Sequence, residues 1–195
     1  LWVMTFLLPF AVWQGASIAL HELFHVLIFE YLPFIILLFA LFTTSSGIRI
    51  TGKFAGTPKM NMVLILAGTV LASCMGTTGA SMLLIRPLLR ANKWRKYRSH
   101  TIIFFIFLVA NIGGGLTPIG DPPLFLGFLN GIDFFWTAKK LFFPIFFTSI
   151  TVLIIYFLID TFYYNRENKS HNNLIYNDEN YNVIGKINIL FILFI

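Results

Sequence analysis

Two short stretches of the sequence combine oxygen-bearing side chains with residues that interrupt helices, and the first covers residues 73–81. Its candidate ligands are Ser73, Thr77, Thr78, Gly79 and Ser81. The hydroxyl groups, and the backbone carbonyls that neighbouring glycines expose, are the ligands that a dehydrated Na⁺ requires. The alternative is that small residues simply allow helices to pack closely in a membrane bundle. Composition alone favours neither interpretation over the other.

The second stretch covers residues 111–123 and reads NIGGGLTPIGDPP. Glycines and prolines this dense break a helix, and they surround one carboxylate, Asp121. A carboxylate inside a membrane is energetically costly and by default indicates function, and when desolvated it can titrate near neutral pH, as proton coupling requires. The alternative is a surface loop or a helix N-cap. The candidate ligands here are Asn111, Gly113, Gly114, Thr117 and Asp121.

A third motif, HELFH at residues 21–25, matches the H-E-x-x-H pattern. In that pattern two histidines, here His21 and His25, bind zinc from one helical face while the glutamate, Glu22, acts as a base. An intramembrane zinc metalloprotease is therefore an alternative function. The competing interpretation is a chance match in an interfacial turn between two membrane crossings. Glu30 is equally compatible with a buried proton carrier and with an interface residue.

The composition requires lipid as the solvent. Hydrophobic residues make up 57% of the 195 residues and charged residues only 11%, which excludes an ordinary water-soluble domain. The apolar blocks lack the alternation of a barrel strand, so the fold class is an all-α, polytopic membrane protein. The net charge of +6 comes mostly from short connections, a pattern that favours membrane topology over nucleic-acid binding.

The hydropathy pattern predicts one transmembrane domain over residues 1–163. Two crossings are expected at residues 1–19 and 26–42, and another at 141–162. Residues 60–89 are too many for one upright helix and too few for two crossings, which predicts a re-entrant helical hairpin with both ends in the cytoplasm. Residues 101–129 predict a discontinuous transmembrane helix. A polar cytoplasmic loop at 164–186 and the start of a truncated next helix at 187–195 complete the prediction.

Two segments carry a family resemblance. They are MGTTGASMLLIRPLLRAN at residues 75–92 and ANIGGGLTPIGDPPLFLGF at residues 110–128. Together they resemble NhaD-type sodium/proton antiporters. More widely they are similar to the ion transporter superfamily, which includes the arsenite pump membrane subunit, the melanosomal P protein, CitMHS-like citrate transporters and sodium-coupled dicarboxylate carriers. The resemblance covers about residues 29–163.

The resemblance implies a site and a mode of action. In these relatives the hairpin tip and the helix break form a sodium site. The resemblance implies that Ser73, Thr77, Thr78, Gly79 and the turn at residues 113–117 surround Na⁺, with Asp121 beside it. The tip reads Thr77-Thr78-Gly79 where dicarboxylate carriers have Ser-Asn-Thr, so their substrate is not carried over. The relatives contain two inverted repeats, and this chain resembles only the amino-terminal one.

The expected function is Na⁺/H⁺ antiport across the inner cell membrane. We expect a truncated or fragmentary copy, with a non-functional remnant as a further alternative. The partners expected are Na⁺, H⁺, the lipid bilayer and either a second copy or a separately encoded second half. Neither an enzymatic activity, nor a cofactor besides the transported Na⁺, nor binding to nucleic acid is expected.

Overall fold

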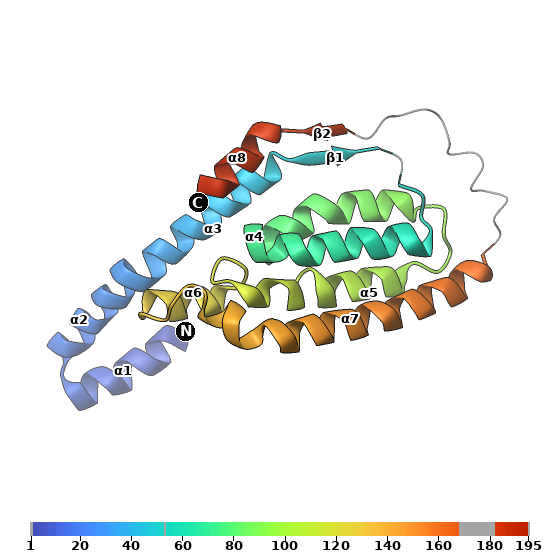
Figure 1. Ribbon diagram of the computed structural model, residues 1–195. Coiled ribbons are helices and arrows are strands. Elements are labelled where there is room, and N and C mark those ends of the chain that lie inside the picture. The colour runs from blue at the N-terminus through green and yellow to red at the C-terminus, as the bar shows by residue number, and fades with distance from the viewer. Residues whose placement is uncertain (1, 53, 168–181, 195) are drawn as a thin grey trace. The chain divides into compact units, whose positions relative to one another are not determined.

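The computed structural model describes residues 2–52, 54–167 and 182–194, which are almost entirely helical (Figure 1). The elements in chain order are α1 (Trp2–Gln14), α2 (Ala16–Val26), a π-helical turn η1 (Leu27–Tyr31), α3 (Leu32–Ser46), β1 (Arg49–Thr51), α4 (Pro58–Ala91), α5 (Ser99–Leu108), a 3₁₀ turn η2 (Ile112–Leu116), α6 (Pro122–Leu129), α7 (Trp136–Asn165), β2 (Asn182–Ile184) and α8 (Lys186–Phe194).

Four helical segments among the described residues are long and apolar enough to cross a membrane. They are Ala16–Ser46, Pro58–Ala91, Ser99–Leu116 and Trp136–Asn165. Many large apolar side chains on them are exposed, such as Phe39, Val70 and Phe147. In water such a surface would be unfavourable, whereas in a bilayer it faces lipid. The protein is therefore an all-α polytopic membrane protein, as the sequence predicts.

The chain divides into two compact units, Leu1–Phe39 and Ala40–Ile195. In the first unit, the chain reverses at Gly15, whose φ of 93° suits a residue without a side chain. The prediction of a turn around His21 and His25 is wrong, because α2, η1 and α3 form one uninterrupted helical segment from Ala16 to Ser46. A few polar side chains do not break a helix, but a positive φ does. Helix α1, with 13 residues, is shorter than the roughly 20 that a crossing needs.

The second unit contains the predicted hairpin. Helix α4 reverses at Gly76, where φ 78° and ψ 152° lie outside the helical region. The arms, residues 58–75 and 77–91, lie side by side (Figure 1). Their far ends are joined by the side-chain amides of Asn61 and Asn92, which donate to each other's carbonyl oxygens at 2.8 Å in both directions.

The predicted discontinuous helix is also present. It consists of α5, the η2 turn and α6, with non-helical backbone at Asn111 and Thr117. Helix α7 runs along α5 (Figure 1), and the Thr137 hydroxyl near its start donates to the Leu116 carbonyl oxygen at 3.0 Å. The core between α4, α5 and α7 is closely packed: Ile65, Ala72, Leu108, Val109 and Tyr156 are all fully buried. This core holds the broken helix against the hairpin.

One feature of the second unit differs from the prediction. Residues 164–186 were predicted as a polar loop, but β2 within this range pairs antiparallel with β1, with Arg49 opposite Ile184 and Thr51 opposite Asn182. Three-residue strands carry too little periodicity to be recognised in a sequence. Residues 168–181 of the predicted loop lie outside the described part of the chain. Helix α8 begins at Lys186, near the predicted start. The domain boundaries themselves stay a prediction.

Candidate functional site

The hairpin tip meets the break in the discontinuous helix. We call residues 73–81 the tip and residues 111–121 the break. The Thr77 amide donates to the Gly120 carbonyl oxygen at 3.2 Å, which joins the two backbones directly. At Gly76, an added Cβ would lie 3.3 Å from the Ile119 carbonyl oxygen. The two stretches that the sequence singled out are therefore in contact, although they lie about 40 residues apart in the chain.

Two hydroxyl groups reinforce this contact in opposite directions. The Ser73 hydroxyl donates to the Gly113 carbonyl oxygen at 2.5 Å, and the Thr117 hydroxyl donates to the Ser73 carbonyl oxygen at 2.5 Å. The Gly120 amide donates back to the Thr117 hydroxyl oxygen at 3.2 Å. Each of these side chains thus links the hairpin to the break or folds the break upon itself. Two hydroxyls and several carbonyls converge as a result.

Glycine is required where the two stretches approach most closely. A Cβ added to Gly114 would lie 2.6 Å from both the Gly120 carbonyl oxygen and the Thr77 methyl group. A Cβ added to Gly113 would lie 2.5 Å from the Thr69 carbonyl oxygen. Both glycines are buried. Any side chain at these positions would push the break away from the hairpin.

The chemistry available at this contact is coordination by neutral oxygens. The Ser73 and Thr117 hydroxyls use their protons in hydrogen bonds to carbonyls, and the Thr117 oxygen also accepts from the Gly120 amide, so Ser73 keeps two oxygen lone pairs and Thr117 keeps one. A carbonyl oxygen also has two lone pairs, so the Gly113 and Gly120 carbonyls can accept a second interaction. Oxygen ligands suit hard cations such as Na⁺. Hydroxyl and carbonyl oxygens are therefore the chemical groups that the tip–break contact offers to a ligand.

The remaining predicted ligands in the tip occupy varied positions. Thr78 is exposed. Gly79 is buried, and a Cβ there would collide with the Ser45 hydroxyl of α3. The Ser81 hydroxyl is buried and has no hydrogen-bond partner among the described residues. Ser73 and Thr77 are therefore the predicted tip residues that the structure brings against the break.

Two predicted residues of the break lie at its ends. The Asn111 side chain is exposed and donates to the Ile106 carbonyl oxygen at 2.8 Å, so it caps the end of α5. Asp121 is the N-cap residue of α6, as one interpretation of the sequence anticipated, and its backbone oxygen accepts from the Leu124 amide at 3.1 Å. The Asp121 side chain is half-buried and makes no capping hydrogen bond. Its carboxylate is available next to Gly120, at the edge of the tip–break contact.

The HELFH motif does not form a metal site in the described part of the chain. Its residues lie within α2, where His21 Nδ1 is 3.9 Å from Glu22 Oε1. His25 packs its ring against Phe29 at a centroid distance of 4.9 Å. No group of three or more His, Cys, Asp or Glu side chains that could hold a metal occurs among the described residues. The zinc-protease alternative is not supported.

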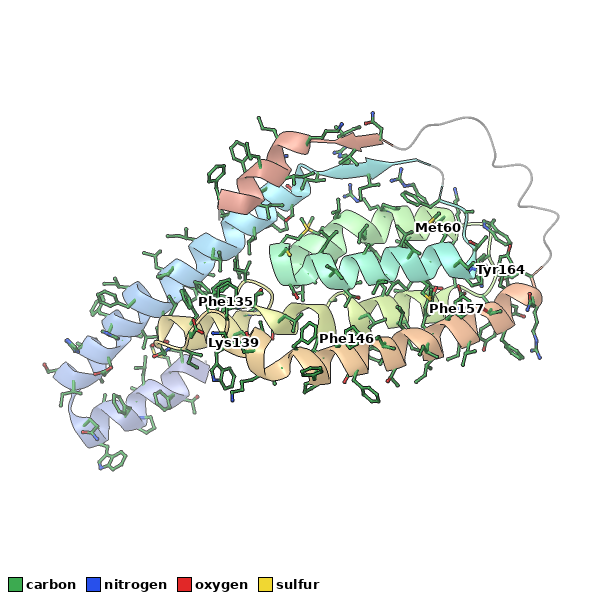
Figure 2. The ribbon with its side chains drawn as sticks, in the orientation of Figure 1. Met60, Phe135, Lys139, Phe146, Phe157 and Tyr164 are labelled. Carbon is green, nitrogen blue, oxygen red and sulfur yellow. The ribbon has the colours of Figure 1, made fainter. Side chains whose placement is uncertain are left out.

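A buried network at the other end of the hairpin was not predicted. Its centre is Asp160 on α7, one helical turn before Tyr164, which Figure 2 labels. One carboxylate oxygen, Oδ1, lies 2.6 Å from Arg95 Nη1 and 2.8 Å from His100 Nε2. The other, Oδ2, accepts from the Asn61 amide at 3.2 Å and from the Tyr156 hydroxyl at 3.1 Å.

This network joins three parts of the fold at one point. Asn61 begins the first arm of α4, Arg95 follows the second arm, His100 begins α5, and Tyr156 and Asp160 lie on α7. The side chains of Arg95 and Asp160 are wholly buried. A sequence signal did exist, because Asp160 interrupts an apolar block and an intramembrane carboxylate needs a partner. The partner could not be identified without knowing which helices meet.

The backbone of Gly76 leads to a testable expectation. Its φ and ψ lie in a region almost restricted to glycine, so Gly76→Ala should destabilise the fold by about 1–3 kcal/mol. The measurement is thermal unfolding of the purified protein in detergent. Gly131→Ala is the matched control, because Gly131 also has a positive φ, of 88°, but a Cβ there meets open space away from the tip. Only Gly76→Ala should also weaken the binding of Na⁺. Equal binding of Na⁺ by the two variants would show that the tip takes no part in ion binding.

Comparisons with known proteins give one family and no individual relative. A family model described as "Putative citrate transport" matches residues 1–195, which is the whole chain. No curated protein and no solved structure matches the chain. The family match supports transport as the general activity, while the resemblance to NhaD-type antiporters rests on the sequence motifs alone.

Proposed function

Because the chain belongs to the family described as "Putative citrate transport", we propose that it is a secondary transporter of the inner cell membrane that exchanges Na⁺ for H⁺. The observation that carries the proposal is the contact between two interrupted helical segments. Such segments at membrane depth are where secondary transporters place their ion and substrate sites. The Thr77–Gly120, Ser73–Gly113 and Thr117–Ser73 hydrogen bonds bring neutral oxygens together at that point.

The proposal assigns separate roles to the two ions. Na⁺ would bind the hydroxyl and carbonyl oxygens of Ser73, Gly113 and Thr117, with further ligands from Thr77, Thr78, Gly79, Ser81, Asn111 and Gly114 as the ion enters or leaves. The proton would bind Asp121, whose carboxylate lies at the edge of the contact and makes no capping hydrogen bond. The same proposal includes a second copy, or a separately encoded half, as the partner that supplies the opposing repeat.

The test is ion exchange in everted membrane vesicles that contain the protein together with any partner repeat. Addition of Na⁺ should dissipate an imposed pH gradient in these vesicles and not in vesicles that lack the protein. Asp121→Asn should reduce this exchange by about tenfold or more, since a ligand or hydrogen-bond partner of a charged group is worth about 1.5–3 kcal/mol. Asp133→Asn, at an exposed aspartate whose ion pair with Lys139 spans 3.3 Å, is the matched control.

Full exchange by Asp121→Asn would reassign that carboxylate to a structural role. Absence of any Na⁺-dependent signal from the unmodified protein would refute antiport itself.

The family description favours one second candidate, which is uptake of a citrate-like anion coupled to Na⁺. The same oxygen site would then bind the coupling ion, and the anion would lie beside it. The vesicles described above distinguish the two functions when uptake of radiolabelled citrate is measured as well as the pH gradient. Na⁺-dependent citrate accumulation without dissipation of a pH gradient would favour the anion carrier over the antiporter.

A further inference from the structure

The second unit contains a cavity of about 750 Å³ whose described lining includes no residue of the tip or of the break. It lies between the end of α3, β1 and the second arm of α4. Three arginines line it: Arg49 from β1, and Arg86 and Arg90 from α4. Arg49 lies 37 to 41 positions before the other two in the chain, so the fold and not the local sequence brings it to the cavity that they line.

The three positive charges have no acidic counterpart in the described structure. None of the described residues that line the cavity is an Asp or a Glu. The ion pairs seen among the described residues involve other basic groups, namely His21, Arg95, His100 and Lys139. Guanidinium groups gathered on one cavity repel one another unless an anion lies between them. Their planar forks match phosphate and carboxylate oxygens in particular.

One arginine and one serine of the cavity wall have defined surroundings. Arg90 donates from Nη2 to the Ile50 carbonyl oxygen at 3.1 Å, which holds its head beside β1. Ser45, only 1% exposed, lines the cavity and has a buried hydroxyl without a hydrogen-bond partner among the described residues. A buried, unpartnered hydroxyl is unfavourable unless a ligand satisfies it. The Ser45 hydroxyl itself is buried against Gly79, so the polar groups that face a ligand in the cavity are those of the arginines.

Apart from Ser46, the other described residues of the wall are apolar. They are Ile48, Ile50, Met82, Leu83, Pro87 and Leu89, and Leu89 is 39% exposed. A small hydrated anion makes no favourable contact with an apolar surface, whereas a phospholipid carries both a phosphate group and an acyl chain. We propose that this cavity binds the phosphate group of an anionic phospholipid, with the arginines on the phosphate and the apolar wall on the chain. Basic pockets among membrane helices are known to hold such headgroups.

The experiment measures binding of phosphatidylglycerol to the full chain in detergent micelles by native mass spectrometry. Each arginine near an anionic lipid contributes roughly a fivefold gain in affinity. Arg49→Gln and Arg86→Gln should therefore each weaken binding of phosphatidylglycerol about fivefold. Arg98→Gln is the matched control, since it removes the same charge from an exposed position that does not line the cavity. It should leave binding unchanged.

Further arms identify the source of the phosphate. Phosphatidylcholine, inorganic phosphate and citrate should fail to compete at concentrations where phosphatidylglycerol binds. Arg86→Lys keeps the positive charge but loses the planar guanidinium group. Binding of phosphatidylglycerol intermediate between that of the unmodified protein and that of Arg86→Gln would support recognition of the phosphate by the guanidinium. An equal loss in Arg98→Gln, or effective competition by free phosphate, would overturn the lipid proposal. These outcomes are independent of ion exchange, so they leave the proposed antiport untouched.

Discussion

Substitution of Asp160 by alanine should destabilise the protein by about 3–5 kcal/mol, because it leaves a buried guanidinium without its counter-charge. Arg95 and Asp160 lie 2.6 Å apart with wholly buried side chains. His100 and Tyr156 lose the same partner in this variant. The measurement is thermal unfolding in detergent, where the midpoint should fall by several degrees.

Two controls separate burial from charge. Asp133→Ala breaks the exposed pair with Lys139 and should change stability by less than about 1 kcal/mol. The double replacement Asp160→Leu with Arg95→Met removes both charges and should recover part of the loss, because an apolar pair of similar volume avoids the unpaired ion. If Asp160→Ala and Asp133→Ala unfold at the same temperature, the buried network does not hold the hairpin base to α5 and α7.

The second large effect is expected at Gly114. A Cβ there would lie 2.6 Å from the backbone oxygen of Gly120 and from the Thr77 methyl group, and a backbone atom cannot move aside as a flexible side chain can. Gly114→Ala should therefore separate the break from the tip and reduce Na⁺-dependent exchange to the level of vesicles without protein. The vesicle assay described above, at equal protein content, is the measurement.

Gly127→Ala on α6 is the matched substitution. Its added Cβ would lie 3.2 Å from the end of the Ile132 side chain, which can shift. It should retain most of the exchange activity. Normal exchange by Gly114→Ala would mean that the close approach of the two stretches is unimportant for transport.

The parts of the fold that the sequence predicts are those marked by strong local signals. Gly76 within an apolar run of about thirty residues, and the cluster of glycines and prolines between Asn111 and Pro123, predict a hairpin and a broken helix from length and backbone preference alone. The expectation that the hairpin tip and the helix break meet rests on the family resemblance. The Ser73 and Thr117 hydrogen bonds bear out the contact itself; binding of Na⁺ there stays a prediction.

Other features depend on contacts that no local pattern records. Asp160 is visible in the sequence as a charge within an apolar helix, but Arg95 and His100 become its partners only once α4, α5 and α7 pack. The sequence predicts a chain reversal at the polar residues around His21, but the reversal lies at Gly15, because a positive φ and not side-chain polarity sets it. The convergence of Arg49 with Arg86 likewise arises from tertiary packing.

The most direct test of the tip–break site is calorimetric titration of NaCl into the purified full chain, with choline chloride as the blank. The account predicts saturable binding of one Na⁺ per chain, weakened about tenfold or more in Thr117→Val, since a ligand of a charged group is worth about 1.5–3 kcal/mol. Thr151→Val, at an exposed position of α7, should bind Na⁺ like the unmodified protein. Heats of NaCl that match those of choline chloride, or equal affinity in Thr117→Val, would contradict the site.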